Sequence, residues 1–233
     1  MTRTRWGGLL ALGLLAACTP TRDEAPAASA PTPEAVRVDG FSALKDATVT
    51  LYPGHCAGVI VADGHHALTA AHCIRGEPGS RQPVVLRKGQ LLGGEVKVVD
   101  VHRDVAVIRL DTLAPVHPLA VASTPPTPGM ALLFAGRNDR PGEPQEIELR
   151  RLGRCPSLPD VPQALFTSLR GAKGDSGAPV VDEHLRVVGL VHGGAACSIA
   201  APTVEVSPLV DMLVAEVARP DAQQGVGGSG SAP

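Results

Sequence analysis

The amino-acid sequence predicts an all-β domain, either a barrel or a sandwich. Hydrophobic residues make up 44% of the 233 residues but aromatic residues only 2%, so the core must be built from Val, Leu, Ile and Ala. Val-rich runs alternate with many of the 26 glycines and 22 prolines, which favours short strands joined by turns. A Pro-rich break at residues 123–129 divides these runs into two halves.

Turn signals bound the expected strands. They include Pro53-Gly54, Asp63-Gly64 and Gly93-Gly94. The strands are expected at residues 47–52, 57–62, 67–70, 84–87, 95–100, 105–110, 131–135, 146–151, 164–167, 178–182, 186–192 and 203–206.

Helical spacing of apolar residues is found only at residues 207–218, where Leu209, Val210 and Leu213 recur on one face. Ser207 suits the N-cap, and Pro208 fits the first turn. A single C-terminal helix is therefore expected.

The first residues form an export signal. Arg3 and Arg5 precede the apolar run at residues 6–17, which is too short to span a membrane comfortably. The run ends in Leu-Ala-Ala-Cys18, which resembles the lipobox of bacterial lipoprotein signal peptides. The resemblance implies cleavage before Cys18 and a lipid anchor on its thiol; the alternative is an ordinary signal peptide with an incidental cysteine.

Low-complexity segments flank the expected domain. Residues 18–37 comprise the lipidated cysteine and a flexible Pro- and Ala-rich tether, and residues 219–233 a disordered tail. The globular domain is expected at residues 38–218. The chain is then exported and held on a bacterial membrane, with the outer membrane or cell surface favoured because Thr19, rather than Asp, follows the anchor. Release would leave it periplasmic or extracellular.

Charge argues against a nucleic-acid partner. The 21 Lys and Arg residues are scattered and slightly outnumbered by the 23 Asp and Glu residues. The membrane is expected to be contacted only through Cys18.

The cysteine count fits an oxidising compartment. Lipidation of Cys18 leaves Cys56, Cys73, Cys155 and Cys197, enough for two disulfides. Four cysteines allow three pairings, and the spacing does not choose among them.

Three polar residues have contexts that suit catalysis by a serine nucleophile. Such catalysis needs a base for the hydroxyl proton, a carboxylate that orients the base, and donors for the oxyanion. His72 follows an expected strand and two small alanines. Asp104 begins the apolar run 105–110, where a partly buried carboxylate needs a donor such as an imidazole N–H. Each could also be structural: a histidine at a strand end, or an aspartate in a solvated turn.

Ser176 lies in a glycine-flanked turn that leads into an expected strand. Glycine permits unusual backbone angles and close approach of a substrate. The N–H groups of Gly174 and Ser176 could together form an oxyanion hole. The alternative is an ordinary Asp-Ser-Gly turn.

Together these segments resemble the trypsin/chymotrypsin family of serine proteases. The family motifs occur here as TAAHC at 69–73, DVAVIRL at 104–110 and GDSGAP at 174–179, and the resemblance spans residues 47–213. The short spacing between motifs is similar to that of compact bacterial HtrA-like members. No PDZ-like segment is expected after residue 218.

The resemblance implies two antiparallel Greek-key six-stranded β-barrels packed face to face, with a C-terminal helix. The first barrel would cover residues 38–122, the second 129–206 and the helix 207–218. The active site would lie in the cleft between the barrels, and the chain would act as a monomer on protein or peptide substrates.

The resemblance also implies the roles of the site residues. Ser176 would be the nucleophile, His72 the general base and then the general acid, and Asp104 the residue that orients His72. Cys56 and Cys73 match a family disulfide, which leaves Cys155 and Cys197 as the other pair. Cys155 would replace the usual partner of Cys197, because Ala172 occupies that partner's place.

Substrate preference is predicted from two possible cations. By the same resemblance, Arg170, six residues before the serine, would lie near the floor of the S1 pocket, and His192 would lie on the strand that forms its wall. An acidic P1 residue would complement both. The alternative is that Arg170 faces solvent and His192 only packs. A second hypothesis rests on residues 37–40, Arg-Val-Asp-Gly, which resemble the family's activation site. Cleavage after Arg37 would then let the new N-terminus pair with Asp175.

Two functions compete with the peptidase. One is a catalytically silent binding module on the cell surface, and the other is an esterase that uses the same triad. No cofactor or metal is expected. Cys56, His72 and Cys73 could form part of a zinc site, but two ligands adjacent in sequence do not match structural-zinc spacing, so a disulfide is favoured. The remaining histidines, among them His65 and His66, are expected at the surface.

Overall fold

The structure is a computed structural model that describes residues 33–137, 144–192, 199–202, 207, 210 and 211. These residues are mostly β-strand, with helix α1 (Pro33–Ala47) at the start and the 3₁₀ turn η1 (Ala71–Cys73). The strands are β1 (Thr48–Leu51), β2 (Cys56–Val61), β3 (His66–Thr69), β4 (Val84–Val85), β5 (Leu91–Leu92), β6 (Gly94–Asp100), β7 (Val105–Leu110), β8 (Ala131–Phe134), β9 (Gln145–Gly153), β10 (Ala164–Thr167), β11 (Pro179–Val181), β12 (Val187–Val191) and β13 (Ile199–Pro202).

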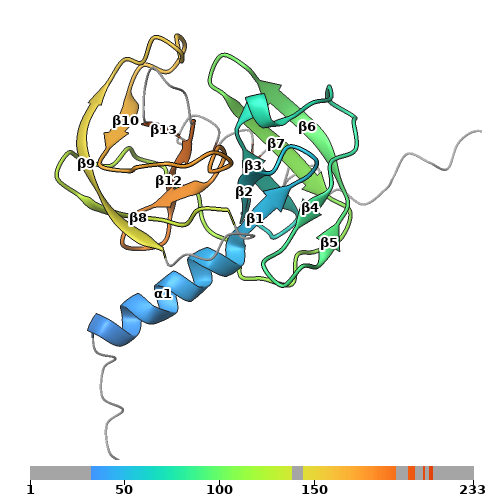
Figure 1. The fold of residues 1–233 in the computed structure, drawn as a ribbon, viewed down its shortest axis with the longest axis horizontal. Coiled ribbons are helices and arrows are strands. Elements are labelled where there is room, and N and C mark those ends of the chain that lie inside the picture. The colour runs from blue at the N-terminus through green and yellow to red at the C-terminus, as the bar shows by residue number, and fades with distance from the viewer. Residues whose placement is uncertain (1–32, 138–143, 193–198, 203–206, 208–209, 212–233) are drawn as a thin grey trace, which may run out of the picture. The chain divides into compact units, whose positions relative to one another are not determined.

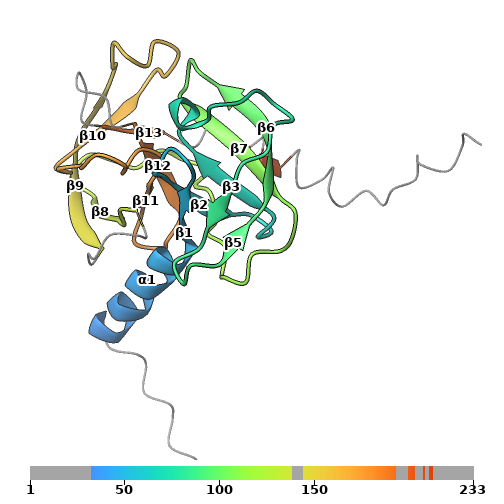
Figure 2. The same ribbon diagram turned by 45° about the vertical axis from the view of Figure 1, so that its right-hand side comes forward.

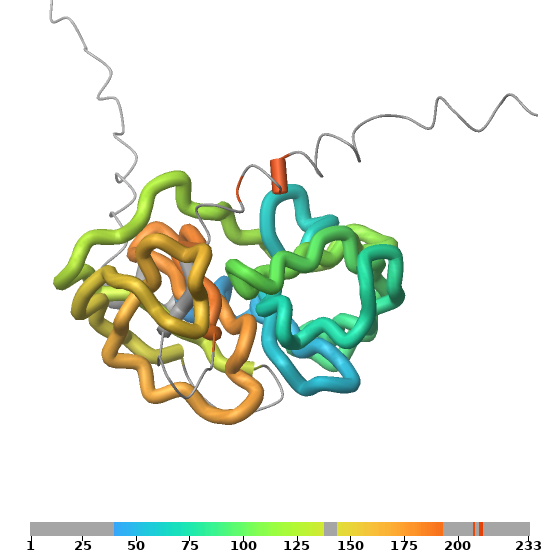
Figure 3. The backbone as a smooth tube through the Cα atoms, turned by 90° about the horizontal axis from the view of Figure 1, so that it is seen from above, coloured from blue at the N-terminus to red at the C-terminus, as the bar shows by residue number. Residues whose placement is uncertain are grey.

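The strands form two sheets, one in each half of the domain (Figures 1 and 2). The first has seven strands in the order β5-β4-β1-β2-β3-β7-β6, and the second is a closed barrel in the order β10-β13-β12-β11-β8-β9. Seen from above, the two halves form two rounded lobes side by side (Figure 3). We call them the first lobe (β1–β7) and the second lobe (β8–β13). The expected all-β fold in two parts is confirmed.

The first lobe differs from the expected six-stranded barrel. The edge strand β5 and its neighbour β4 have two residues each, too short to close the sheet with a continuous ladder. The chain just before β4 completes the curl instead. Gln82 N donates to Gly94 O at 2.9 Å and Val96 N to Ser80 O at 2.9 Å, which brings β6 back beside residues 80–82. The sheet therefore curls on itself through irregular backbone.

The segment between the lobes is hydrogen-bonded to both. Leu119 N donates to Ile60 O of β2 at 3.0 Å, and Ala62 N donates to Leu119 O at 3.2 Å. Three residues later, Ala122 N donates to Val187 O of β12 at 2.9 Å. The Pro-rich break that follows at 123–129 thus begins where the chain has already joined the second lobe.

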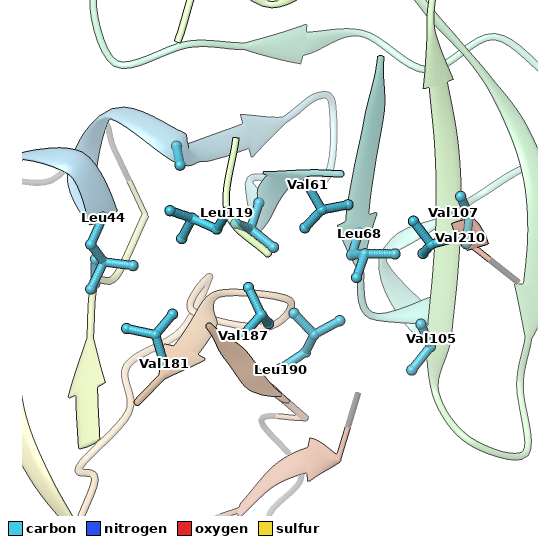
Figure 4. Close-up of a cluster of buried hydrophobic side chains, with 13 residues drawn as sticks. Leu44, Val61, Leu68, Val105, Val107, Leu119, Val181, Val187, Leu190 and Val210 are labelled. Carbon is cyan, nitrogen blue, oxygen red and sulfur yellow. The ribbon is translucent and has the colours of Figure 1, made fainter. Parts of the chain in front are cut away.

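An apolar cluster fills the space between the lobes, and we call it the interlobe cluster. Figure 4 shows side chains from β2, β3 and β7 facing those of β11 and β12. Each Val or Leu side chain of the cluster contributes about 1.5–3 kcal/mol when fully buried. Its buried members are Leu44, Ala47, Val59, Val61, Leu68, Val105, Val107, Leu119, Ala135, Val181, Val187, Leu190 and Val210.

Helix α1 is the main difference from the sequence prediction. The sequence predicts a flexible tether up to residue 37, a domain that begins at residue 38 and a strand that begins at residue 47, but no helix in this segment. Apolar residues in this segment show no clear helical period, so packing rather than pattern fixes the helix. Leu44 and Ala47 are fully buried in the interlobe cluster, and Thr48 Oγ1 donates to Leu44 O at 2.7 Å. Arg37, the proposed activation site, lies within this helix.

The C-terminal predictions are described only in part. Ser207, Val210 and Asp211 have helical backbone, and Val210 is buried in the interlobe cluster; the rest of the expected helix lies outside the described residues. The last described strand is β13 at Ile199–Pro202, whereas the expected strand 203–206 lies outside them. In the described part of the chain, no helix has both the length and the apolar character that crossing a membrane requires.

Candidate active site

His72 and Asp104 meet at the edge of the first lobe. His72 lies in η1, directly after β3, and Asp104 ends the turn between β6 and β7. His72 Nδ1 is 2.9 Å from Asp104 Oδ2, and the backbone N–H of His72 donates to Oδ1 at 3.0 Å. The carboxylate therefore fixes both the ring and the backbone of the histidine.

The turn before β7 aims Asp104 at η1. Asp100 Oδ1 accepts the backbone N–H groups of His102 at 3.1 Å and Arg103 at 3.0 Å, which holds the turn closed. Asp104 then adopts φ 56°, a left-handed conformation that few residues other than Gly, Asn and Asp tolerate. Asp104 as a whole is 4% exposed, so the turn carries its side chain into the protein rather than into solvent.

Burial and hydrogen bonding set the ionisation of this pair. Burial alone would raise the pKa of Asp104, but hydrogen bonds from His192 and His72 outweigh it and lower the pKa to about 2. The hydrogen bond to Asp104 raises the pKa of His72, although partial burial opposes this. At neutral pH, Asp104 is ionised and accepts a proton-bearing Nδ1, which leaves Nε2 of His72 as the basic nitrogen.

Ser176 approaches this pair from the second lobe. Its carbonyl oxygen accepts the backbone N–H of Ala57 in β2 at 2.8 Å and lies 3.8 Å from Cys73 Sγ, next to His72 in sequence. No hydrogen bond joins the Ser176 hydroxyl to His72 within the described residues. Such bonds between nucleophile and base often tighten only when substrate binds.

Gly177 makes this approach possible. It has φ 81°, and a Cβ placed there would lie 2.9 Å from Ala70 N and still closer to Ala57 O and Thr69 Oγ1. Its backbone N–H donates to Val191 O at 2.7 Å, which ties the turn to β12. Only a residue without a side chain lets the serine turn touch the first lobe here.

The expected oxyanion donors are free of internal acceptors. Within the described residues, the backbone N–H groups of Gly174 and Ser176 donate to no acceptor, and both residues are partly exposed. Gly174 has φ 95°, and Arg137 packs over it while donating to His55 O at 2.7 Å. Between them, Asp175 is buried, and its Oδ2 accepts the N–H of Ala172 at 2.6 Å. Both donors therefore remain available to a ligand.

His192 also contacts Asp104. Its Nδ1 bonds to Asp104 Oδ2, the oxygen that also receives His72, and its Nε2 lies 3.0 Å from Ser157 Oγ. The rings of His192 and His72 meet edge to face, with centroids 5.8 Å apart. Two imidazoles from different lobes thus share one carboxylate.

One disulfide supports the histidine turn. Cys56 at the start of β2 and Cys73 in η1 are joined, with an S–S distance of 2.08 Å, as the family resemblance implied. Both sulfurs are therefore unavailable as thiolate ligands for zinc. Cys155 is also disulfide-bonded, but Cys197, its expected partner, lies outside the described residues, so that pairing stays a prediction.

Comparison with known proteins places the chain in a family. Residues 56–190, more than half of the chain, match the model of the trypsin-like peptidase domain. The chain belongs to the trypsin-like peptidase family. A search of curated proteins found no match.

Solved structures of low identity share the fold of this trypsin-like peptidase. The inactive form of the Rv3671c protease is 19% identical with a TM-score of 0.59, covering 82% of this chain and 98% of that one. Its active form, from M. tuberculosis, is 20% identical with a TM-score of 0.60, covering 78% and 87%. The HtrA-type protease AlgW with a decapeptide is 17% identical with a TM-score of 0.60, covering 77% and 67%.

Two histidines of this trypsin-like peptidase have surroundings that differ from those the sequence predicts. His66 was expected at the surface, but it is fully buried in β3, with Nδ1 3.0 Å from Asp63 Oδ1; its neighbours in the sheet decide this, since the local sequence reads as a turn. His192 was assigned to a specificity pocket, whereas both of its ring nitrogens have protein partners. Arg170 is exposed. The acidic-P1 hypothesis stays a prediction.

The contact between Asp104 and His192 was missed by sequence reasoning. A polar residue at the end of the buried run of β12 was its only signal. Such a residue can face a pocket, solvent or another side chain, and the choice depends on how the two lobes dock.

The close approach at Gly177 can be tested by Gly177→Ala, with Gly129→Ala as the matched control. Both glycines have positive φ, 81° and 89°, but a Cβ at Gly129 would meet nothing within 4 Å. We expect Gly129→Ala to lower the free energy of unfolding by about 1–2 kcal/mol through backbone strain alone. Gly177→Ala should cost about 1–3 kcal/mol more because of overpacking. Urea unfolding measures both, and equal losses would contradict the close approach.

Proposed function

We propose that this trypsin-like peptidase is a serine endopeptidase that cleaves peptide bonds through an acyl-enzyme, with Ser176, His72 and Asp104 as its catalytic residues. The observation that carries the proposal is the Asp104 carboxylate holding His72 Nδ1 beside the turn of Ser176. The family match supports peptidase chemistry. The decapeptide named with AlgW supports peptides as the substrate class.

The first half of the reaction forms the acyl-enzyme. Ser176 Oγ attacks the carbonyl carbon of the substrate while its proton passes to Nε2 of His72. The carbonyl oxygen becomes an oxyanion, which accepts the N–H groups of Gly174 and Ser176. When the intermediate collapses, the C–N bond breaks and Nε2 gives its proton to the leaving amine.

The second half repeats these steps with water. His72 removes a proton from water, the resulting hydroxide attacks the acyl carbon, and the proton then returns to Ser176 as the product acid leaves. Asp104 stays ionised throughout, because its pKa of about 2 lies far below the working range. It keeps the Nδ1 proton in place and stabilises the imidazolium that forms twice per turnover.

Ser176→Ala tests the nucleophile. On a mixed peptide library, we expect the wild type to cleave and the variant to lose activity by about 10⁶-fold, because no other group replaces the hydroxyl. A fluorophosphonate probe should label the wild type only. Ser123→Ala, which changes an exposed serine far along the chain from the motif, is the matched control and should keep full activity.

Each other outcome identifies a different function. A folded wild type that neither cleaves peptides nor reacts with the probe would be a silent binding module. Probe labelling with hydrolysis of model esters but no peptide cleavage would identify an esterase. The same library gives the P1 preference, and a preference for Arg, Lys or large apolar residues would reject the acidic-P1 hypothesis.

The pH dependence of kcat/KM tests His72 as the base. The pKa of His72 is raised above its ordinary value of 6.5 by Asp104, and only the neutral ring can accept a proton from serine. With an uncharged substrate, kcat/KM should fall about tenfold per pH unit below that raised pKa. Asp104→Asn should cost about 10⁴-fold and move the acid limb to lower pH. An acid limb centred at or below 6.5 in the wild type would contradict the assignment.

The chain is further proposed to act from a lipid anchor at Cys18. The support is the Leu-Ala-Ala-Cys18 motif after the apolar run 6–17; these residues lie outside the described part of the structure. In a bacterial host, radiolabelled palmitate should enter the wild type, which should partition into the membrane fraction. Cys18→Ala should abolish the label and release the protein from the membrane. A labelled Cys18→Ala variant, or an unlabelled wild type in the soluble fraction, would reject the anchor.

A further inference from the structure

The chemistry proposed above needs one imidazole beside Asp104, yet the rings of both His72 and His192 contact this carboxylate. Asp104 Oδ2 receives Nδ1 of His72 at 2.9 Å and Nδ1 of His192 as well. The side chains of His192 and Asp104 are 12% and 5% exposed, so both are held inside the protein. His192 takes no part in the proposed acyl-transfer reaction.

We propose that His72, Asp104 and His192 form a binding site for a divalent transition-metal ion, Zn²⁺ in the first instance, whose binding inhibits the peptidase. One ligand atom from each residue is available, and all three lie within 4.8 Å of one another. Two imidazole nitrogens and a carboxylate oxygen are a common ligand set for zinc. Mg²⁺ and Ca²⁺ prefer sites built from oxygen alone, so they should bind poorly.

The geometry needs only a small change to accept the ion. Ligands about 2.0–2.2 Å from a tetrahedral zinc lie about 3.3–3.6 Å from one another, so each Nδ1 must withdraw slightly from Oδ2. The side chain of His72 is 45% exposed and can turn toward solvent. The fourth position would then face solvent and take a water molecule.

Ser157 holds the ring of His192 in the way that a hydrogen-bond partner commonly holds a metal-bound histidine. Its Oγ lies 3.0 Å from Nε2 of His192, the nitrogen opposite the ligating one. Metal-bound histidines usually make a hydrogen bond through their second nitrogen, which fixes the orientation of the ring. His192 is thus held with Nδ1 facing Asp104.

Binding of the ion would compete with catalysis directly. Zn²⁺ takes the lone pair of each Nδ1, and the two Nδ1 protons leave to solvent, while Asp104 is already ionised. His72 then no longer donates Nδ1–H to Asp104, and a metal-bound ring is a weaker base. Removal of the ion by a chelator restores both protons and the original hydrogen bonds, so the inhibition is reversible.

The binding arm of the test uses Ser176→Ala protein without a polyhistidine tag, so that it does not depend on activity. Titration calorimetry with Zn²⁺ should show one equivalent bound with micromolar or tighter affinity, and Co²⁺ should give the visible absorption of tetrahedral coordination. Adding His192→Ser should weaken binding by more than about 100-fold, and Ser157→Ala by about 10-fold. His184→Ala, which removes an exposed histidine, is the matched control and should bind as tightly as its parent.

The activity arm rests on the proposed function. Zn²⁺ should inhibit peptide cleavage by the wild type with a midpoint near its measured dissociation constant, and EDTA should restore the activity. If the wild type never cleaves peptides, the binding arm still decides the metal site.

Three results would overturn the site: no binding to the Ser176→Ala protein, equal binding after His192→Ser, or loss of binding in His184→Ala. Circular dichroism checks the fold of each variant. If His192→Ser does not fold, His192→Gln keeps a polar side chain of similar length and takes its place.

Discussion

The fold depends on the contact between the serine turn and the first lobe. The backbone of Ser176 and Gly177 lies against Ala57 and Ala70, at a distance that no side chain at position 177 would permit. The candidate nucleophile comes from one lobe and the candidate base from the other, so the site exists only while this contact is made. The apolar interlobe cluster holds the two surfaces together around it, and the backbone hydrogen bond from Ala57 sets the register.

Much of the β-structure could be predicted from the sequence because the residue pattern within each strand is enough to indicate it. Apart from Arg109, the runs at β7 and β10 consist of Val, Ile, Leu, Phe, Ala and Thr. They are bounded by polar or turn residues, and both are predicted with the observed ends. The Cys56–Cys73 disulfide followed from a family resemblance carried by a short motif. Edge strands of two residues, such as β5, carry too little pattern to be recognised.

What the sequence did not reveal depends on contacts between distant segments. Helix α1 has no clear apolar period, and it is fixed by Leu44 and Ala47, which bury themselves among residues of both lobes. His66 looked like part of a turn and is enclosed by the sheet around β3. His192 ends a buried run, and only the docking of the lobes directs its ring to Asp104. None of these three features can be predicted before the tertiary contacts are known.

Through helix α1, the chain enters the domain by packing directly against the cluster between the two lobes. The chain passes through Leu44, which touches the same buried cluster as Leu68 of β3 and Val105 of β7. These two residues lie just upstream of η1 and just after Asp104. A force applied to α1 would therefore act on the cluster that packs against the strands next to the candidate base and its carboxylate. For a protein held through the proposed anchor at Cys18, this packing would link the point of attachment to the candidate active site.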